Sequence, residues 1–283
     1  MEKIAYIAGF PKSGTTWLRM LFSAYLNRKL DINNLLCTRG DTYRYAYQMV
    51  SPKPLDELDL WEWAALAPAA ALHLPSCVTE RPLLIKTHHT LSEAFGHQVV
   101  PLGLFDKAIY IVRDPRDVAI SLSKHIGTDI DTAIERMIDP GGALFKAPEP
   151  PQFVSSWANN VVSWVKNKEI AVAVVRYEEL FDSPEETFGA LMLFLGEKET
   201  VEMRDNVKNA VSLAALENVR KQEDAKGFVE ASRKAERFFG AGGSKWRDVL
   251  TDTQVAQIEE ACGQTMVGLG YPLESKPQLV VAR

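Results

Sequence analysis

The sequence predicts an α/β fold: a single domain with a central, mostly parallel sheet flanked by helices. Three observations lead to this expectation. The chain has 283 residues, of which 46% are hydrophobic and 24% charged, as in a globular protein with enough chain to bury a core. Short apolar runs that suit buried strands alternate with segments of helical periodicity. We find no internal repeat and no compelling domain boundary, so we expect one domain over residues 1–283.

The first elements read as strand, turn and helix. Residues 4–9 form a short apolar run that ends in glycine, as in a strand buried on both faces of a parallel sheet. Residues 16–27 then carry apolar side chains at helical spacing. A further short strand is expected at 83–86.

The same pattern returns twice later in the chain. The run 107–113 is followed by Asp-Pro, which can cap and start a helix over 116–126. The run 170–177 precedes Ser-Pro-Glu-Glu, which has capping-box spacing before a helix over 187–195. Strands that alternate with helices favour a parallel sheet.

Two segments are expected to be additions to this frame. Residues 33–75 are rich in aromatics and interrupted by prolines, and 127–151 contain turn signals. Pockets for small molecules are mostly apolar with a few polar groups, so both segments could line one. Packing of a small helical subdomain is the alternative. The aromatic residues concerned are Tyr43, Tyr45, Tyr47, Trp61 and Trp63.

Charge and cysteine usage exclude several classes of protein. The chain has 32 Lys and Arg against 37 Asp and Glu, a net charge of −5, which argues against a nucleic-acid coat or a basic membrane-surface protein. The 3 cysteines lie far apart without metal-ligand spacing, and no stretch approaches the ~18 apolar residues of a membrane span. We therefore expect a cytoplasmic protein with reduced thiols, no metal site and no nucleic-acid partner.

The loop between the first expected strand and helix has the features of an anion-binding loop. Its sequence, Gly-Phe-Pro-Lys-Ser-Gly-Thr-Thr over 9–16, brings backbone N–H groups and a helix N-terminus together. Its glycines have Walker A spacing, but in that motif a lysine follows the second glycine directly. Here the lysine is Lys12, inside the loop, and Thr15 and Thr16 follow the glycine. A kinase loop therefore fits poorly, and a plain helix cap beside a surface lysine is the alternative.

A second anion-binding position is indicated where the run 107–113 ends. Arg113 ends this run, and Ser121 lies in the expected helix that follows. A guanidinium and a hydroxyl so placed could hold one phosphate from two sides. The alternative is a structural Arg113 paired with Asp114 or Asp117.

The residues at and after the end of the run 83–86 are of the types found in proton-transfer sites. Period-two alternation puts Lys86 and His88 on one face and Thr87 on the other. A histidine, with a reference pKa of ~6.5, can act as a general base near neutral pH, while lysines offset negative charge. Two structural histidines are the alternative, and His89 competes with His88 for the role of base.

These motifs together resemble the sulfotransferases that use 3′-phosphoadenosine 5′-phosphosulfate (PAPS). Pro-Lys-Ser-Gly-Thr-Thr-Trp-Leu at 11–18 is similar to the 5′-phosphosulfate loop of that family. Lys-Thr-His at 86–88 resembles its catalytic segment, and 110–121 its 3′-phosphate site. The chain is most similar to the cytosolic, small-molecule branch, in a bacterial-type variant, and the matching blocks span nearly its whole length.

The resemblance implies an enzyme that transfers a sulfuryl group from PAPS to a hydroxyl of a phenol, alcohol or natural product. The product would be adenosine 3′,5′-bisphosphate (PAP), no metal would take part, and a homodimer is allowed. His88 would be the general base, and Lys12 and Lys86 would stabilise the transferring group. The implied nucleotide ligands in the first two blocks and the third strand run are Lys12, Ser13, Gly14, Thr15, Thr16, Trp17, Arg113, Ser121 and Tyr177.

The C-terminal phosphate loop departs from the family pattern. The family typically has Arg-Lys-Gly-x-x-Gly before the tryptophan that corresponds to Trp246, whereas this chain has Phe239, Gly240 and Ala241 at the first three positions. The usual arginine is therefore missing or displaced. Backbone N–H groups of Gly240, Gly242 and Gly243 can still bind a phosphate. The basic residues that could replace the arginine are Arg237, Lys245 and Arg247.

A second departure concerns adenine. Leu216 stands where the family has an aromatic residue over the second face of the base, which predicts a looser hold on the base. Two other classes of function remain open from the sequence. One is a P-loop phosphoryl-transfer enzyme, and the other is a non-catalytic nucleotide-binding protein.

Overall fold

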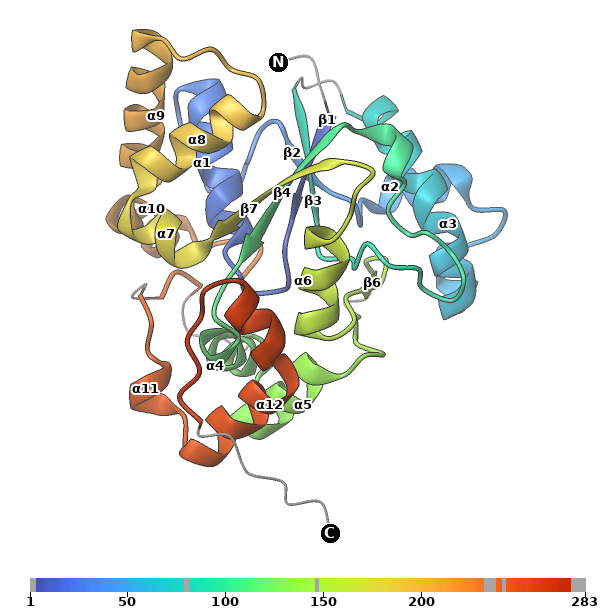
Figure 1. The fold of residues 1–283 in the computed structure, drawn as a ribbon. Coiled ribbons are helices and arrows are strands. Elements are labelled where there is room, and N and C mark those ends of the chain that lie inside the picture. The colour runs from blue at the N-terminus through green and yellow to red at the C-terminus, as the bar shows by residue number, and fades with distance from the viewer. Residues whose placement is uncertain (1–3, 79–81, 146–147, 232–237, 241–242, 276–283) are drawn as a thin grey trace.

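A five-stranded parallel sheet forms the centre of the molecule (Figure 1). The structure is a computed structural model that describes residues 4–78, 82–145, 148–231, 238–240 and 243–275. The strand order is β2-β3-β1-β4-β7, and all neighbours pair in parallel, so the carboxyl ends of the strands share one edge. The strands are β1 (Ile4–Ala8), β2 (Thr38–Gly40), β3 (Leu83–Thr87), β4 (Lys107–Val112) and β7 (Ala171–Arg176).

Alternation along the central strands divides the core into two layers. On β1, Tyr6 and Ala8 pack into one cluster of buried side chains, while Ala5 and Ile7 pack into another on the opposite face. The central strands are buried on both faces because helices cover both, which explains their continuous apolar sequences. The predicted α/β fold with a parallel sheet is confirmed.

One layer of helices covers the face that carries Ile7, to the left of the sheet in Figure 1. These helices are α1 (Thr15–Asn27), α7 (Tyr177–Asp182), α8 (Pro184–Phe194), α9 (Val201–Leu213) and α10 (Leu216–Lys226). The opposite layer consists of α2 (Arg44–Val50), α3 (Leu60–His73), α4 (Pro115–Ile126), α5 (Ile130–Ile138), α6 (Trp157–Val165) and α12 (Asp252–Gly268).

Within the part that the structure describes, no helix is both long and apolar enough to span a membrane.

Short elements complete the described chain. The short elements are the 3-10 helices η1 (Leu55–Glu57), η2 (Leu74–Ser76) and η3 (Leu102–Leu104), the antiparallel pair β5 (Ala143–Leu144) and β6 (Gln152–Phe153), and α11 (Trp246–Val249).

The segment 33–75, which was expected to be an addition to the frame, supplies one strand of the central sheet. Thr38–Gly40 is strand β2, the edge of the central sheet, and it pairs with β3. Three residues with one glycine carry no period-two signal, so the sequence could not reveal this strand. The segment also contains α3, which continues through Pro68 and begins with a capping box between Asp59 and Glu62.

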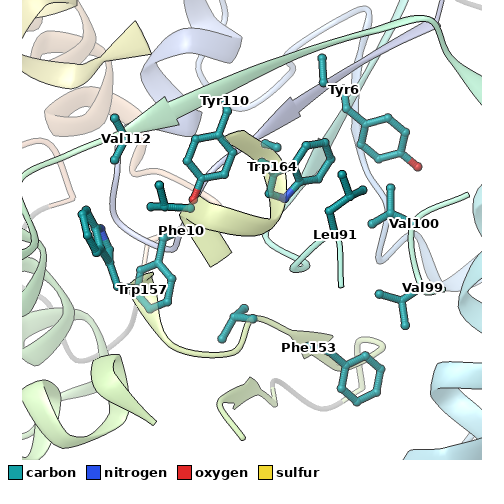
Figure 2. Close-up of a cluster of buried hydrophobic side chains, with 14 of the residues drawn as sticks. Tyr6, Phe10, Leu91, Val99, Val100, Tyr110, Val112, Phe153, Trp157 and Trp164 are labelled. Carbon is teal, nitrogen blue, oxygen red and sulfur yellow. The ribbon is translucent and has the colours of Figure 1, made fainter. Parts of the chain in front are cut away.

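Aromatic packing fixes α6 against the sheet. Trp164 lies 6.3 Å from Tyr6 of β1 and 6.1 Å from Tyr110 of β4, measured between ring centroids. Figure 2 shows this group together with Trp157 and Phe153. Because α6 and β6 are held here, residues 153–160 lie beside the carboxyl end of β3, which contains Lys86 and is followed by the two histidines.

Candidate active site

The loop after β1 is shaped by two glycines that contact the sheet and α7 closely. A Cβ on Gly9 would lie 2.5 Å from the carbonyl oxygen of Ile111. Gly14 has a φ of 107°, and a Cβ there would lie 2.6 Å from the Tyr177 ring. Helix α1 begins directly after Gly14, which has no side chain to cap the first N–H groups. The helix N-terminus and the loop therefore present N–H groups that suit an anion.

Four cationic side chains gather around this loop. Lys12 lies with its Nζ 4.5 Å from the Phe238 ring centroid. Burial, helped by the charges of Arg113 and Lys86, lowers the pKa of Lys12 to about 8. Burial also lowers the pKa of Lys86, and the nearby positive charge of Arg19 adds to this decrease. Like charges held together in this way favour an anionic ligand. The sequence reading included three of these cations and missed Arg19.

His88 is held in one tautomer by the loop after β1. Its Nδ1 lies 2.5 Å from the carbonyl oxygen of Gly9, and a carbonyl only accepts hydrogen bonds, so Nδ1 carries the proton. Nε2 is then the basic nitrogen of the neutral ring. Burial, together with the Lys86 charge, moves the pKa of His88 well below its ordinary value, so the ring is neutral at neutral pH.

His89 has the opposite arrangement. Its Nδ1 accepts a hydrogen bond from the backbone N–H of Phe153 at 3.0 Å, so the proton of the neutral ring is on Nε2. That nitrogen lies 3.7 Å from Asp41 Oδ2. Burial lowers the pKa of His89, and the Asp41 charge opposes this change. The ring therefore has no free basic nitrogen, in contrast to His88.

Arg113, at the end of β4, faces the loop and not a carboxylate. Its guanidinium carbon lies 4.5 Å from the Tyr177 ring centroid, and Nη2 donates to the carbonyl of Gly243 at 3.3 Å. Asp114 is bonded to Arg116 instead, and Asp117 accepts from Ser244 and Lys245 on the C-terminal loop. Among the described residues, Arg113 therefore does not form the ion pairs with Asp114 or Asp117 that a purely structural role would require.

A family model described as a sulfotransferase domain matches residues 3–270. The chain belongs to the sulfotransferase family. Cytosolic sulfotransferase 13 of Arabidopsis thaliana is 25% identical over 283 residues, which cover 94% of this chain and 77% of that protein. Carbohydrate sulfotransferase 2 of Mus musculus is 30% identical over 203 residues, which cover 62% of this chain and 36% of the relative.

The fold of this sulfotransferase is also found among solved structures. Retinol dehydratase, in a complex with retinol and PAP, is similar with a TM-score of 0.62 and 18% sequence identity. The match covers 98% of this chain and 84% of that chain. In the described parts of this sulfotransferase, no three His, Cys, Asp or Glu side chains lie together as ligands of a metal ion would.

An aromatic group lies beside the loop after β1 of the sulfotransferase. Trp17 on α1 is 5.8 Å from Tyr177 and 6.3 Å from Phe181, both in edge-on geometry. Its Nε1 donates to the carbonyl of Ala214 at 2.9 Å, which fixes the indole. Leu216, the first residue of α10, packs against the same buried cluster. Trp17, Tyr177 and Leu216, the three residues predicted to bind the base, all pack against this cluster.

Arg220 holds the C-terminal loop of the sulfotransferase, a role that sequence reasoning missed. Its Nε donates to the carbonyl of Phe239 at 3.0 Å, and Nη2 donates to that of Gly240. Glu223 accepts from the N–H groups of Phe238 and Phe239 at 2.7 and 3.2 Å. Both residues lie on α10, 15 to 20 residues from the loop. No local pattern in the loop could reveal them.

The predicted replacements for the missing arginine lie in different surroundings. Arg247 is bonded to Glu274 at 2.6 Å and covers the Trp246 ring, and its side chain is largely exposed. Lys245 is exposed. Arg237 and Gly242 lie outside the described residues. Ser121 is half-buried on α4, one and a half turns from its start.

Proposed function

We propose that this sulfotransferase transfers a sulfuryl group from PAPS to a hydroxyl of a small acceptor, with His88 as the general base. The observation that carries the proposal is the contact between His88 Nδ1 and the Gly9 carbonyl. It leaves Nε2 as the basic atom, close enough to Lys86 and Lys12 for both charges to depress the pKa of the ring. A base and two cations are the groups that such a transfer needs.

In the proposed reaction, His88 Nε2 takes the proton of the acceptor hydroxyl as its oxygen attacks the sulfur. The bond between sulfur and the bridging oxygen breaks, and PAP leaves with the electron pair. Lys12 and Lys86 offset the negative charge on the transferring group and on the leaving phosphate. A cationic Lys12 matters here because Lys12 is itself part of the loop that would hold that phosphate.

The donor would bind along the edge formed by the loop and α4. The loop residues and the α1 N-terminus would hold the 5′-phosphate, and Arg113 with Ser121 the 3′-phosphate. Ser13 supports this assignment because its hydroxyl is buried and finds no partner among the described residues. Trp17, Tyr177 and Leu216 would enclose the adenine. The full proposed set is Lys12, Ser13, Gly14, Thr15, Thr16, Trp17, Arg113, Ser121, Tyr177, Leu216, Phe239, Gly240, Gly242 and Gly243.

The acceptor is proposed to be a small hydroxylated molecule with apolar surface. Retinol, an alcohol, is bound in the solved structure of retinol dehydratase. In this chain, Phe95 is more than half exposed and contacts Phe153, which in turn lies 5.8 Å from His89. Exposed aromatics on the 33–75 segment, among them Trp61, support its part in acceptor binding. The relatives named cytosolic sulfotransferases support a cytoplasmic location.

The decisive experiment incubates the purified protein with 35S-labelled PAPS and a panel of phenols and alcohols. We expect labelled acceptor and stoichiometric PAP, without added metal. Turnover of Mg-ATP with no transfer from PAPS would favour a phosphoryl-transfer enzyme. Tight PAP binding with no transfer to any acceptor at any pH would favour a non-catalytic nucleotide-binding protein.

A further inference from the structure

A carboxylate lies against the loop that is proposed to bind the donor. Glu230 Oε1 is 2.7 Å from Arg19 Nη1, and Oε2 accepts a hydrogen bond from Thr16 Oγ1 at 3.4 Å. Burial by itself would raise the pKa of Glu230, but the charges of Arg19 and Lys86 and the hydrogen bond from Thr16 lower it. The carboxylate is therefore ionised at neutral pH, within the group of cations.

The segment that leads into Glu230 is anchored to the rest of the protein. The N–H of Val229 donates to Asn33 Oδ1 at 2.8 Å, and Asn33 Nδ2 donates to the carbonyl of Gly227 at 3.1 Å. Phe228 is buried, with its ring centroid 5.1 Å from that of Phe239. The Glu230 side chain itself is 38% exposed. A fixed backbone with a partly exposed side chain allows the carboxylate to leave the loop without refolding the segment.

Thr16 is one of the residues proposed to hold the 5′-phosphate. A carboxylate and a phosphate cannot share this hydroxyl, because two anions a few ångströms apart repel each other strongly in a partly buried site. We propose that Glu230 is an internal competitor for the 5′ anion of the nucleotide. The inference rests on the proposed function: Glu230 would occupy Thr16 and Arg19 until the nucleotide displaces it, and would return as PAP leaves.

Such a residue tunes donor affinity without touching the reacting atoms. It weakens the binding of every ligand with a 5′ anion, and so also of the product PAP. Release of product limits turnover in many enzymes, and a returning carboxylate shortens the lifetime of the product complex. When the Glu230 carboxylate withdraws, Arg19 Nη1 becomes free to contact the incoming anion. This contact offsets part of the free-energy cost of displacing Glu230.

The test compares two nucleotides and two variants by calorimetry. PAP has the 5′-phosphate, whereas adenosine 3′-monophosphate lacks it. Glu230→Gln keeps the shape of the side chain and removes the charge. Glu202→Gln is the matched control, because Glu202 forms an exposed ion pair with Arg28 and its loss changes the net charge equally. We expect Glu230→Gln to bind PAP about tenfold more tightly than the wild type does, and adenosine 3′-monophosphate with the same affinity as the wild type. Glu202→Gln should bind both nucleotides as the wild type does.

Several outcomes would overturn the inference. One is unchanged or weaker PAP binding by Glu230→Gln, and another is equal tightening of both nucleotides, which would indicate a general charge effect. If Glu230→Gln does not fold, Glu230→Asp is measured instead, since the shorter chain cannot keep both contacts. Loss of folding in both variants would make Glu230 a structural partner of Arg19 and overturn the inference. Failure of the wild type to bind PAP would overturn the proposed function as well.

Discussion

His88 Nδ1 and the carbonyl oxygen of Gly9 lie 2.5 Å apart, which links the proposed base to the loop that is proposed to bind the donor. The two residues are 79 positions apart in sequence, and each follows a strand, β3 and β1, that pairs with the other. The position of the imidazole therefore depends on the position of the loop. The contact also decides which histidine has a free basic nitrogen.

The first prediction concerns that choice of base. His88→Ala is expected to lower kcat by at least about 10²-fold, because general-base catalysis typically contributes that much. The affinity for PAP, measured by calorimetry, should change little, since Gly9, whose carbonyl the imidazole contacts, is not one of the proposed phosphate ligands. An active His88→Ala variant together with an inactive His89→Ala variant would move the role to His89.

Arg113 is expected to act through the 3′-phosphate. Arg113→Met should weaken PAP binding about 10- to 100-fold, the range for loss of a charge-assisted contact to phosphate. Adenosine 5′-monophosphate, which lacks the 3′-phosphate, serves as the matched ligand and should bind the variant and the wild type alike. Equal losses for both nucleotides would show that Arg113 supports the fold of the loop instead.

Lys12 should give activity an alkaline limit. Its pKa is lowered to about 8, so the free enzyme loses this charge as the pH rises through 8, far below the ordinary range of lysine. Since the charged form favours the anionic donor, kcat/KM for PAPS is expected to fall above pH 8. In Lys12→Arg the charge persists, so the limit should move upward in whatever activity remains. A profile that stays flat to pH 9.5 in the wild type would contradict this prediction.

Gly14 should tolerate no side chain. Gly14→Ala combines a left-handed backbone with a Cβ placed 2.6 Å from the Tyr177 ring. Gly196 is the matched control, because its φ of 99° is similar but nothing lies within 4 Å of an added Cβ. We expect Gly14→Ala to reduce the free energy of unfolding by about 1–3 kcal/mol more than Gly196→Ala, measured by denaturant titration. Equal losses in the free energy of unfolding would mean that the Tyr177 ring moves aside at little cost.

Asn160 should stabilise the backbone around His88. Its Nδ2 donates to the carbonyls of His88 and Val154 at 3.0 and 2.8 Å, and its Oδ1 accepts from Tyr110 at 2.7 Å, all in the core. Asn160→Ala leaves these groups unpaired and is expected to cost about 2–3 kcal/mol in the free energy of unfolding. Asn159→Ala, an exposed change on the same helix, should cost little. Similar losses for the two variants would refute the assignment.

The anion loop and the strand ends could be predicted from sequence because their signals are local. A strand, a glycine-bearing loop and a helix follow one another in the first 27 residues, and parallel strands place their carboxyl ends at one edge. The order of Lys12, Lys86 and Arg113 at three such ends therefore indicated one shared site. The edge strand β2 escaped prediction because Thr38–Gly40 is too short for a pattern.

The sequence by itself determined the fold class, the family resemblance and three of the four cations of the site, since these depend on residue type and short spacing. Only the tertiary structure decided the tautomers and hydrogen-bond partners of the titratable groups. The tautomers of His88 and His89 depend on the Gly9 carbonyl and the Phe153 N–H, which lie 79 and 64 residues away. Glu230 reaches Thr16 across 214 residues. Such contacts depend on distance in space, and hydrogen bonds and charges between distant segments leave no periodic trace in the chain.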